Sequence, residues 1–104
     1  MPTTETLTLL QGDCEGGCEP DKNPWKPEGQ KDVRIHNKSG SKQVLSNIRG
    51  SCLKTKNGKN EDTITLEPDE IWKGKAGKKA KKGTYIYDDG CPTEGPRTGH
   101  IDPS

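Results

Sequence analysis

Apolar residues occupy every second position in several short stretches between residues 32 and 90. In the segment 33–37, Val33 and Ile35 fall on one side, and Arg34 and His36 fall on the other. Because successive side chains of a β-strand point to opposite faces, this alternation predicts half-buried strands. Similar stretches at 43–48, 62–66, 71–76 and 83–89 predict further strands. The expected core comprises Val33, Ile35, Val44, Leu45, Ile48, Leu53, Ile64, Leu66, Ile71, Trp72, Tyr85 and Tyr87.

Glycine, proline and asparagine mark the segments between these stretches. The pair Asn57-Gly58 lies between Leu53 and Ile64, and an Asn-Gly pair favours a type I′ hairpin turn. Glycine and proline are dense between residues 12 and 29, so little regular structure is expected there beyond the short alternating run 6–9. No stretch repeats its apolar residues with a period of 3.6, so no helix is expected.

The chain of 104 residues has room for one domain. Within it we expect a loop-rich N-terminal segment at 1–31, a β core at 32–91 and an irregular tail at 92–104. Short strands separated by turn residues predict an all-β fold, a small antiparallel β-sandwich or Greek-key barrel of immunoglobulin-like outline. Trp25 is expected to pack on this core because the chain has few large apolar side chains.

The small apolar content changes what the fold needs. Only 24% of the residues are apolar, and phenylalanine is absent. A core of this size offsets little of the conformational entropy lost on folding, so the chain needs crosslinks, a metal or a partner. Four cysteines can supply crosslinks in three different pairings. They are Cys14, Cys18, Cys52 and Cys91.

Disulfides are favoured over structural zinc because only Cys14 and Cys18 form a short-spaced pair, whereas a zinc site usually has two such pairs. The favoured pairing joins Cys52 with Cys91 and Cys14 with Cys18. A crossed pairing would instead tie the acidic N-terminal loop to the sandwich. Free thiols and disulfide exchange by Cys14 and Cys18 are further alternatives, although two neighbouring glutamates would raise the thiol pKa and disfavour exchange.

Three stretches within residues 32–91 read as an alternating strand ending in Asn, a proline-containing turn, and Gly-Thr-Tyr leading to a cysteine. They are VRIHNKSGS, ITLEPDEIW and GTYIYDDGC, and in this order they resemble the strands of the cupredoxin-like family. The resemblance implies a cupredoxin-like sandwich and, in copper-binding members, two histidines, a cysteine thiolate and a weak axial methionine. Cys91 matches the family's cysteine, so His36 or His100 would supply imidazole. No methionine follows Cys91, and the copper ligands are largely missing.

The net charge of +1 is unevenly distributed, since residues 31–60 carry eight basic residues and one acidic residue. Six further lysines lie close together: Lys73, Lys75, Lys78, Lys79, Lys81 and Lys82. Clustered lysines are a candidate contact for an anionic surface or a protein partner, and nucleic acid is less favoured because no aromatic residue interrupts the run. For the run itself the favoured interpretation is that these lysines keep an exposed loop soluble or keep an edge strand from pairing with other chains.

No carboxylate pair, nucleophile with a nearby histidine, or phosphate-binding glycine loop stands out, so an enzyme is not expected. The sequence predicts a small non-catalytic binding or structural module that is stabilised by disulfides and needs no cofactor. The alternative is a copper protein of cupredoxin descent that uses Cys91 with His36 or His100. No stretch approaches the ~20 apolar residues of a membrane span. The cysteines favour a secreted or periplasmic mature chain, while the first residues lack a signal-peptide pattern and also fit the cytoplasm.

Overall fold

A computed structural model of the chain describes residues 5–92 and 96–104. Within these residues the regular structure is β-strand, and no helix occurs. The strands are β1 (Glu5–Gln11), β2 (Cys18–Pro20), β3 (Asp32–Asn37), β4 (Gln43–Arg49), β5 (Leu53–Lys54), β6 (Ile64–Leu66), β7 (Ile71–Ala76), β8 (Gly83–Tyr87) and β9 (Arg97–Ile101). The expectation of an all-β fold is therefore confirmed.

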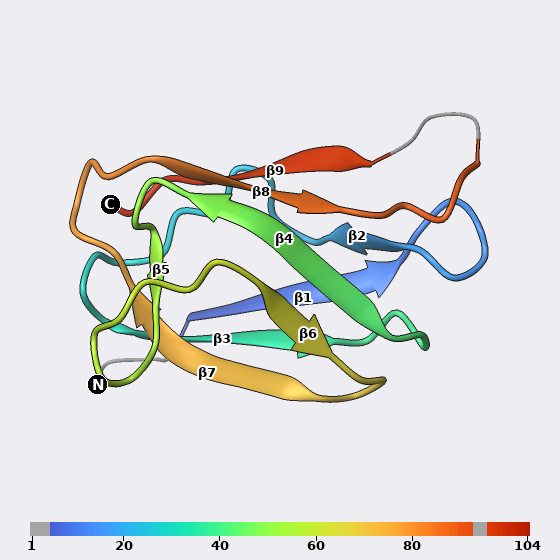
Figure 1. Cartoon of the computed structure of the whole chain (residues 1–104), viewed down its shortest axis with the longest axis horizontal. Helices are drawn as coiled ribbons and strands as arrows, with labels where there is room; N and C mark the ends of the chain where they lie inside the picture. The colour runs from blue at the N-terminus through green and yellow to red at the C-terminus, as the bar shows by residue number, and fades with distance from the viewer. Residues whose placement is uncertain (1–4, 93–95) are drawn as a thin grey trace.

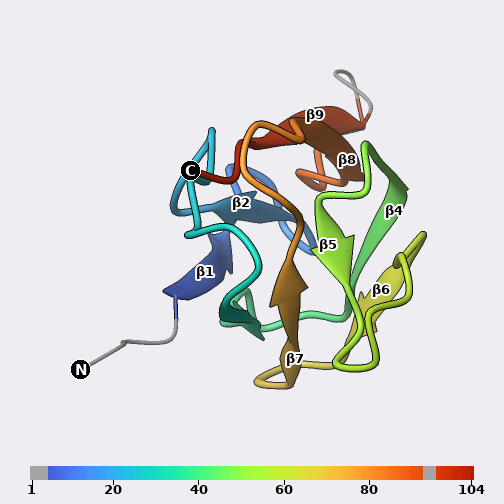
Figure 2. The same cartoon turned by 90° about the vertical axis from the view of Figure 1, so that its left-hand side faces the viewer.

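The strands form two sheets that face each other across the core (Figures 1 and 2). The five-stranded sheet has the order β2-β1-β3-β7-β5, and the four-stranded sheet has the order β6-β4-β8-β9. All pairs in the four-stranded sheet are antiparallel. In the five-stranded sheet β1 runs parallel to β3, which is a departure from the antiparallel sandwich that the sequence predicts.

The core lies between the inner faces of the two sheets, and most of the expected core residues are in it. Trp25 is also buried, as expected, with 1% of its surface exposed. Two expectations were wrong, because Val44 is 43% exposed and Ile71 is 40% exposed. On β4 the inward positions are taken by Gln43 and Leu45, so Val44 points outward. The buried apolar residues are Leu7, Leu9, Cys18, Trp25, Val33, Ile35, Leu45, Ile48, Cys52, Leu53, Ile64, Leu66, Ala76, Tyr85, Tyr87 and Ile101, with Trp72 packed against them.

The two segments expected to be irregular contribute strands to both sheets. In the segment 1–31, β1 lies between β2 and β3, and its Leu7 and Leu9 are fully buried. In the expected tail 92–104, β9 pairs with β8 along its whole length, and Ile101 is buried. The tail was missed because Gly99 takes an inward position where an apolar side chain would have marked a strand. A Cβ at Gly99 would collide with the ring of Tyr85.

The Asn57-Gly58 pair does lie in a tight turn, but the turn is not of type I′. A type I′ turn needs positive φ at both central residues, and here only Gly58 has a positive φ, of 86°. The Gly58 N–H donates to the Thr55 carbonyl at 2.9 Å, and the Thr55 N–H donates to the Lys59 carbonyl at 2.7 Å. This is a three-residue hairpin with glycine in the left-handed position.

Candidate functional site

One disulfide is present, and it joins Cys14 to Cys91. Cys18 and Cys52 are free and buried, so the expected pairs Cys52–Cys91 and Cys14–Cys18 were wrong. The bond is of the crossed kind, because it ties the N-terminal loop to the segment after β8. Cys18 begins β2 and is fully buried in the core, whereas Cys14 is half-buried in the loop after β1.

The two free thiols are core residues. Burial raises the pKa of the Cys18 thiol to about 12 and that of the Cys52 thiol to about 11. The carboxylates of Asp88 and Asp89 contribute further to the shift at Cys18. Because the thiolate is the reactive form, neither cysteine is suited to disulfide exchange near neutral pH.

The disulfide lies beside an ion pair whose carboxylate, that of Asp89, is buried while its Arg97 partner is partly exposed. The Asp89 carboxylate accepts a hydrogen bond from the Cys91 N–H at 2.9 Å and another from Arg97 Nε at 2.6 Å. These bonds, first the one from the Cys91 backbone, lower the pKa of Asp89. Gly17 packs against the Asp89 backbone so closely that a Cβ there would collide with it. The loops after β1 and β8 are therefore held together by the disulfide and by close packing, while the ion pair ties the loop after β8 to β9.

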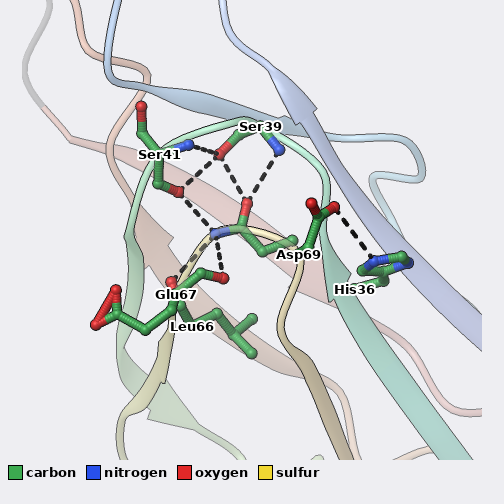
Figure 3. A network of polar contacts seen from close by, with 7 residues as sticks. His36, Ser39, Ser41, Leu66, Glu67 and Asp69 are labelled. Atoms are coloured by element: carbon green, nitrogen blue, oxygen red, sulfur yellow. Dashed lines mark hydrogen bonds and ion pairs between the residues drawn. The ribbon is translucent and has the colours of Figure 1, made fainter.

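A second polar network joins the two sheets near the same end of the molecule (Figure 3). Asn37 Nδ2 donates to the carbonyl oxygens of Ser41 at 2.7 Å, Leu66 at 3.1 Å and Glu67 at 3.2 Å. Its Oδ1 accepts from the Ser39 hydroxyl at 2.7 Å and from the Ser39 N–H at 3.0 Å. Asn37 lies at the end of β3, whereas Leu66 ends β6, so one side chain connects the two sheets. We call residues 12–17, 37–43, 67–70 and 88–92 the crosslinked end.

The structure does not bring the candidate copper ligands together. The Cys91 sulfur is bonded to Cys14 and is not available as a thiolate. His36 Nε2 lies 3.9 Å from the Asp69 carboxylate, while His100 is exposed on β9. Within residues 5–92 and 96–104, no group of three or more His, Cys, Asp or Glu side chains is placed to hold a metal ion. The copper site expected from Cys91 with His36 or His100 is not formed.

The six lysines of the segment 73–82 do not form one patch. Lys73 and Lys75 project from the outer face of β7, in alternation with the inward Trp72, Gly74 and Ala76. The remaining four lie in the loop between β7 and β8, where Ala80 has a φ of 68° and Lys81 N–H donates to the Lys78 carbonyl. Of these, Lys82 lines a groove beside the four-stranded sheet.

Basic residues from other strands join Lys73 and Lys75. Arg34 on β3 lies directly opposite Lys73, and Lys54 on β5 lies directly opposite Lys75. Residues directly opposite each other in antiparallel strands lie on the same face of the sheet, so these four cations form two adjacent rows. Two shallow hollows of about 170 and 350 Å³ border the rows. With Lys56 and Lys78, which line the hollows, we call Arg34, Lys54, Lys56, Lys73, Lys75 and Lys78 the cationic face.

Within residues 5–92 and 96–104, no ion pair neutralises the cations of this face. The ion pairs found among the described residues are His36–Asp69, Lys42–Glu67 and Arg97–Asp89. Asp32 is the one acidic residue in register with the two rows, opposite Lys75. Like charges placed directly opposite each other on a sheet destabilise it. Sequence analysis missed Arg34 and Lys54, because only the strand register places them beside the β7 lysines.

No aromatic side chain stands on the cationic face. The chain has two tryptophans and two tyrosines, and Trp25, Tyr85 and Tyr87 are buried in the core. Trp72 points inward from β7, and its Nε1–H donates to the Glu61 carboxylate at 3.0 Å. A ligand on this face would therefore meet charge without a surface for stacking rings.

Comparison of the chain with family models, with curated proteins and with solved structures gives no match. In the part of the chain that the structure describes, no helix has the length and apolar character needed to cross a bilayer.

Proposed function

We propose that this protein is a small non-catalytic binding module that holds a polyanionic partner on its cationic face. The observation that supports the proposal most strongly is the pair of like-charged matches, Arg34 with Lys73 and Lys54 with Lys75. Each match places two cations side by side at a cost in stability. An anion bound between the two cations would remove their repulsion, so the like charges would no longer destabilise the sheet in the bound state.

The spacing of the charges suits a polymer better than a single ion. Side chains two positions apart on a strand, such as Lys73 and Lys75, are separated by about 6.5–7 Å, and neighbouring strands lie about 4.8 Å apart. The cationic face is therefore a grid of charges rather than one concave pocket. A chain with repeated sulfate, carboxylate or phosphate groups can contact several of these cations at once.

The absence of aromatic side chains from this face bears on which polyanion is favoured. Single-stranded nucleic acids are usually held by base stacking on aromatic rings in addition to contacts with phosphate. The four aromatic residues lie in the core or point toward it, so base stacking is not available on the cationic face. An acidic polysaccharide, which is recognised through its charges alone, fits the face better.

The test is binding of the purified protein to immobilised heparin at several salt concentrations. We expect the protein to bind heparin at low salt. Its affinity should fall at least about tenfold between low and physiological salt, because contacts with a dense polyanion release counterions. The double variant Lys73→Gln/Lys75→Gln should lose most of the affinity. The matched control Lys38→Gln/Lys42→Gln removes the same charge at the crosslinked end and should bind like the unmodified chain.

If both double variants weaken binding equally, net charge rather than the cationic face is responsible, and the proposal is wrong. A synthetic single-stranded oligonucleotide serves as the competing ligand. Tighter binding to this oligonucleotide than to heparin, at equal salt, would replace the polysaccharide assignment with nucleic acid.

We propose further that the protein works in an oxidising compartment, as a secreted or periplasmic chain. The Cys14–Cys91 disulfide supports this, because such bonds persist outside the reducing cytosol. Thiol alkylation of protein taken directly from its native cells, followed by mass measurement, tests the assignment. Two alkylated cysteines are expected after denaturation without reductant, and four alkylated cysteines would contradict it.

A further inference from the structure

A groove of about 510 Å³ lies beside the four-stranded sheet. It lies at the end of the molecule opposite the disulfide, where β4 ends, β8 begins and the C-terminus lies (Figure 1). This volume falls within the range of about 300–1,000 Å³ that is usual for small-ligand sites. The lining residues are Pro24, Arg49, Gly50, Lys82, Gly83, Thr84, His100, Ile101 and Asp102.

Three of the polar side chains of the groove come from one row of the sheet. Arg49 on β4 is directly opposite Thr84 on β8, and Thr84 is directly opposite His100 on β9. The register therefore places a guanidinium, a hydroxyl and an imidazole next to one another on the outer face. Lys82 adds a second permanent cation immediately before β8. Neither Arg49 nor Lys82 is part of an ion pair found among the described residues.

The shape of the groove depends on an irregular end of β4. The register with β8 shifts between Ser46 and Arg49, and Asn47 and Ser51 have positive φ angles of 50° and 55°. Such conformations are costly for residues other than glycine, and they tend to occur where function requires them. A Cβ at Gly50 would collide with the Lys82 carbonyl, so glycine permits the close approach of these two segments.

We infer that this groove binds a small organic anion, with a carboxylate between Arg49 and Lys82 and an apolar body against Pro24. Arg49 suits a carboxylate because its guanidinium can donate two parallel hydrogen bonds. Pro24 and the glycine backbone offer the apolar surface on which the body of the ligand rests. The site is independent of the proposed polyanion function, because it belongs to the other sheet and shares no residue with the cationic face.

Asp102 argues for a small ligand rather than a second polyanion contact. It is half-buried and lines the same groove, so a run of negative charges would be repelled there. The backbone holds it in position, since the Asp102 N–H donates to the Trp25 carbonyl at 2.7 Å. A ligand with one carboxylate and, at its far side, one hydrogen-bond donor would satisfy Arg49, Lys82 and Asp102 together.

The probe is para-hydroxybenzoate, which has a carboxylate, an apolar ring and a hydroxyl donor. It is titrated into the isotope-labelled full chain while backbone amide resonances are followed by NMR. We expect saturable shifts that concentrate at residues 49–50, 82–84 and 100–102. The neutral isostere para-hydroxybenzamide should shift these resonances far less, because it lacks the charge that Arg49 and Lys82 recognise.

Variants separate the groove from general anion adsorption. Arg49→Gln and Lys82→Gln should each weaken para-hydroxybenzoate binding at least about tenfold, as expected for loss of charge-assisted hydrogen bonding. Lys79→Gln is the matched control, since it removes a lysine from the same loop and should leave the affinity unchanged. Asp102→Asn should weaken para-hydroxybenzoate more than it weakens benzoate.

The inference is overturned if the acid and the amide bind equally, if the shifts map to the cationic face, or if Lys79→Gln has the same effect as Lys82→Gln. Competition by equimolar inorganic phosphate would also overturn it, since the groove would then bind any anion. Failure of heparin binding together with success of this titration would leave the groove intact and remove only the polyanion function.

Discussion

The two ends of the sandwich are held together by different interactions. At the crosslinked end a disulfide and the Asn37 network join the two sheets, and the Asp89–Arg97 ion pair ties the loop after β8 to β9. At the opposite end, which we call the open end, the segments 28–32, 77–82 and 101–104 are connected by backbone hydrogen bonds. Gly29 N–H donates to the Ser104 carbonyl at 2.9 Å, and Ala80 N–H donates to the Pro103 carbonyl at 3.1 Å.

The open end also contains the features that a fold would avoid if stability were its only requirement. Like charges face each other at Lys54 and Lys75. The groove lies there as well. Natural proteins tolerate such features where they serve binding, provided that other parts supply the stability. The crosslinked end therefore supplies stability, and the open end is the proposed binding end.

The largest effect is expected from removal of the disulfide in the double variant Cys14→Ser/Cys91→Ser. The bond closes a loop of 77 residues, and the chain-entropy model assigns such a loop about 4 kcal/mol of stability. Denaturant unfolding measures the loss, and the unmodified chain with reductant should match the variant. Heparin binding under conditions where the variant is folded should persist, because no residue of the cationic face belongs to the crosslinked end.

Replacement of Asn37 by alanine should have the next largest effect. The change leaves the carbonyl oxygens of Leu66 and Glu67 without their shared donor in a buried site. Unpaired buried polar groups of this kind cost about 1–3 kcal/mol each, so a loss of about 3 kcal/mol is expected. Asn57→Ala, in an exposed turn, is the control and should change the free energy of unfolding by less than about 0.5 kcal/mol. Equal losses in the two variants would mean that Asn37 does not join the sheets.

The alternation of apolar residues predicted much of this architecture. It placed Val33, Ile35, Tyr85 and Tyr87 inward, and these residues are buried. It was wrong at Val44, because two apolar residues stand side by side at 44 and 45 and either could face inward. Leu45 rather than Val44 faces inward because Gln43 is buried on the same side of β4. The Gln43 Nε2 donates to Ser39 Oγ at 2.9 Å and to the Gly16 carbonyl at 3.1 Å. A buried polar anchor of this kind cannot be recognised from alternation.

The features that depend on contacts between distant segments could not be predicted from the sequence. The disulfide requires the loops 12–17 and 88–91 to meet, and nothing in the spacing of Cys14 and Cys91 indicates it. The cationic face requires the register of β3 and β5 on β7, and the lysine run around Lys73 revealed only part of it. The groove requires the irregular end of β4, which has no marker in the sequence other than Gly50.

Lowering the pH should reduce the stability of the fold, because it protonates Asp89 at the crosslinked end. Its pKa is lowered in the fold, so its contribution to stability is present above the unfolded pKa of about 3.9 and is lost as the pH falls through the folded value. Thermal unfolding midpoints measured between neutral and strongly acidic pH should fall less steeply in Asp89→Asn than in the unmodified chain. Asp62→Asn, which alters an exposed carboxylate elsewhere, is the control. Identical acid profiles for all three proteins would contradict the proposed role of the Asp89–Arg97 pair.

The smallest effect is expected at the cationic face, and it should have the opposite sign. Lys73→Thr removes the repulsion from Arg34 and places a good strand former on β7, so the free energy of unfolding should rise by about 0.5 kcal/mol. Heparin affinity should fall in the same variant. Lys79→Thr, in the loop, should change neither quantity to a comparable extent. A chain that becomes more stable while it binds less tightly would mean that the open end keeps its like charges for the partner. A fall in stability for Lys73→Thr would mean that the lysine stabilises the sheet, and the contrast between the two ends would then be lost.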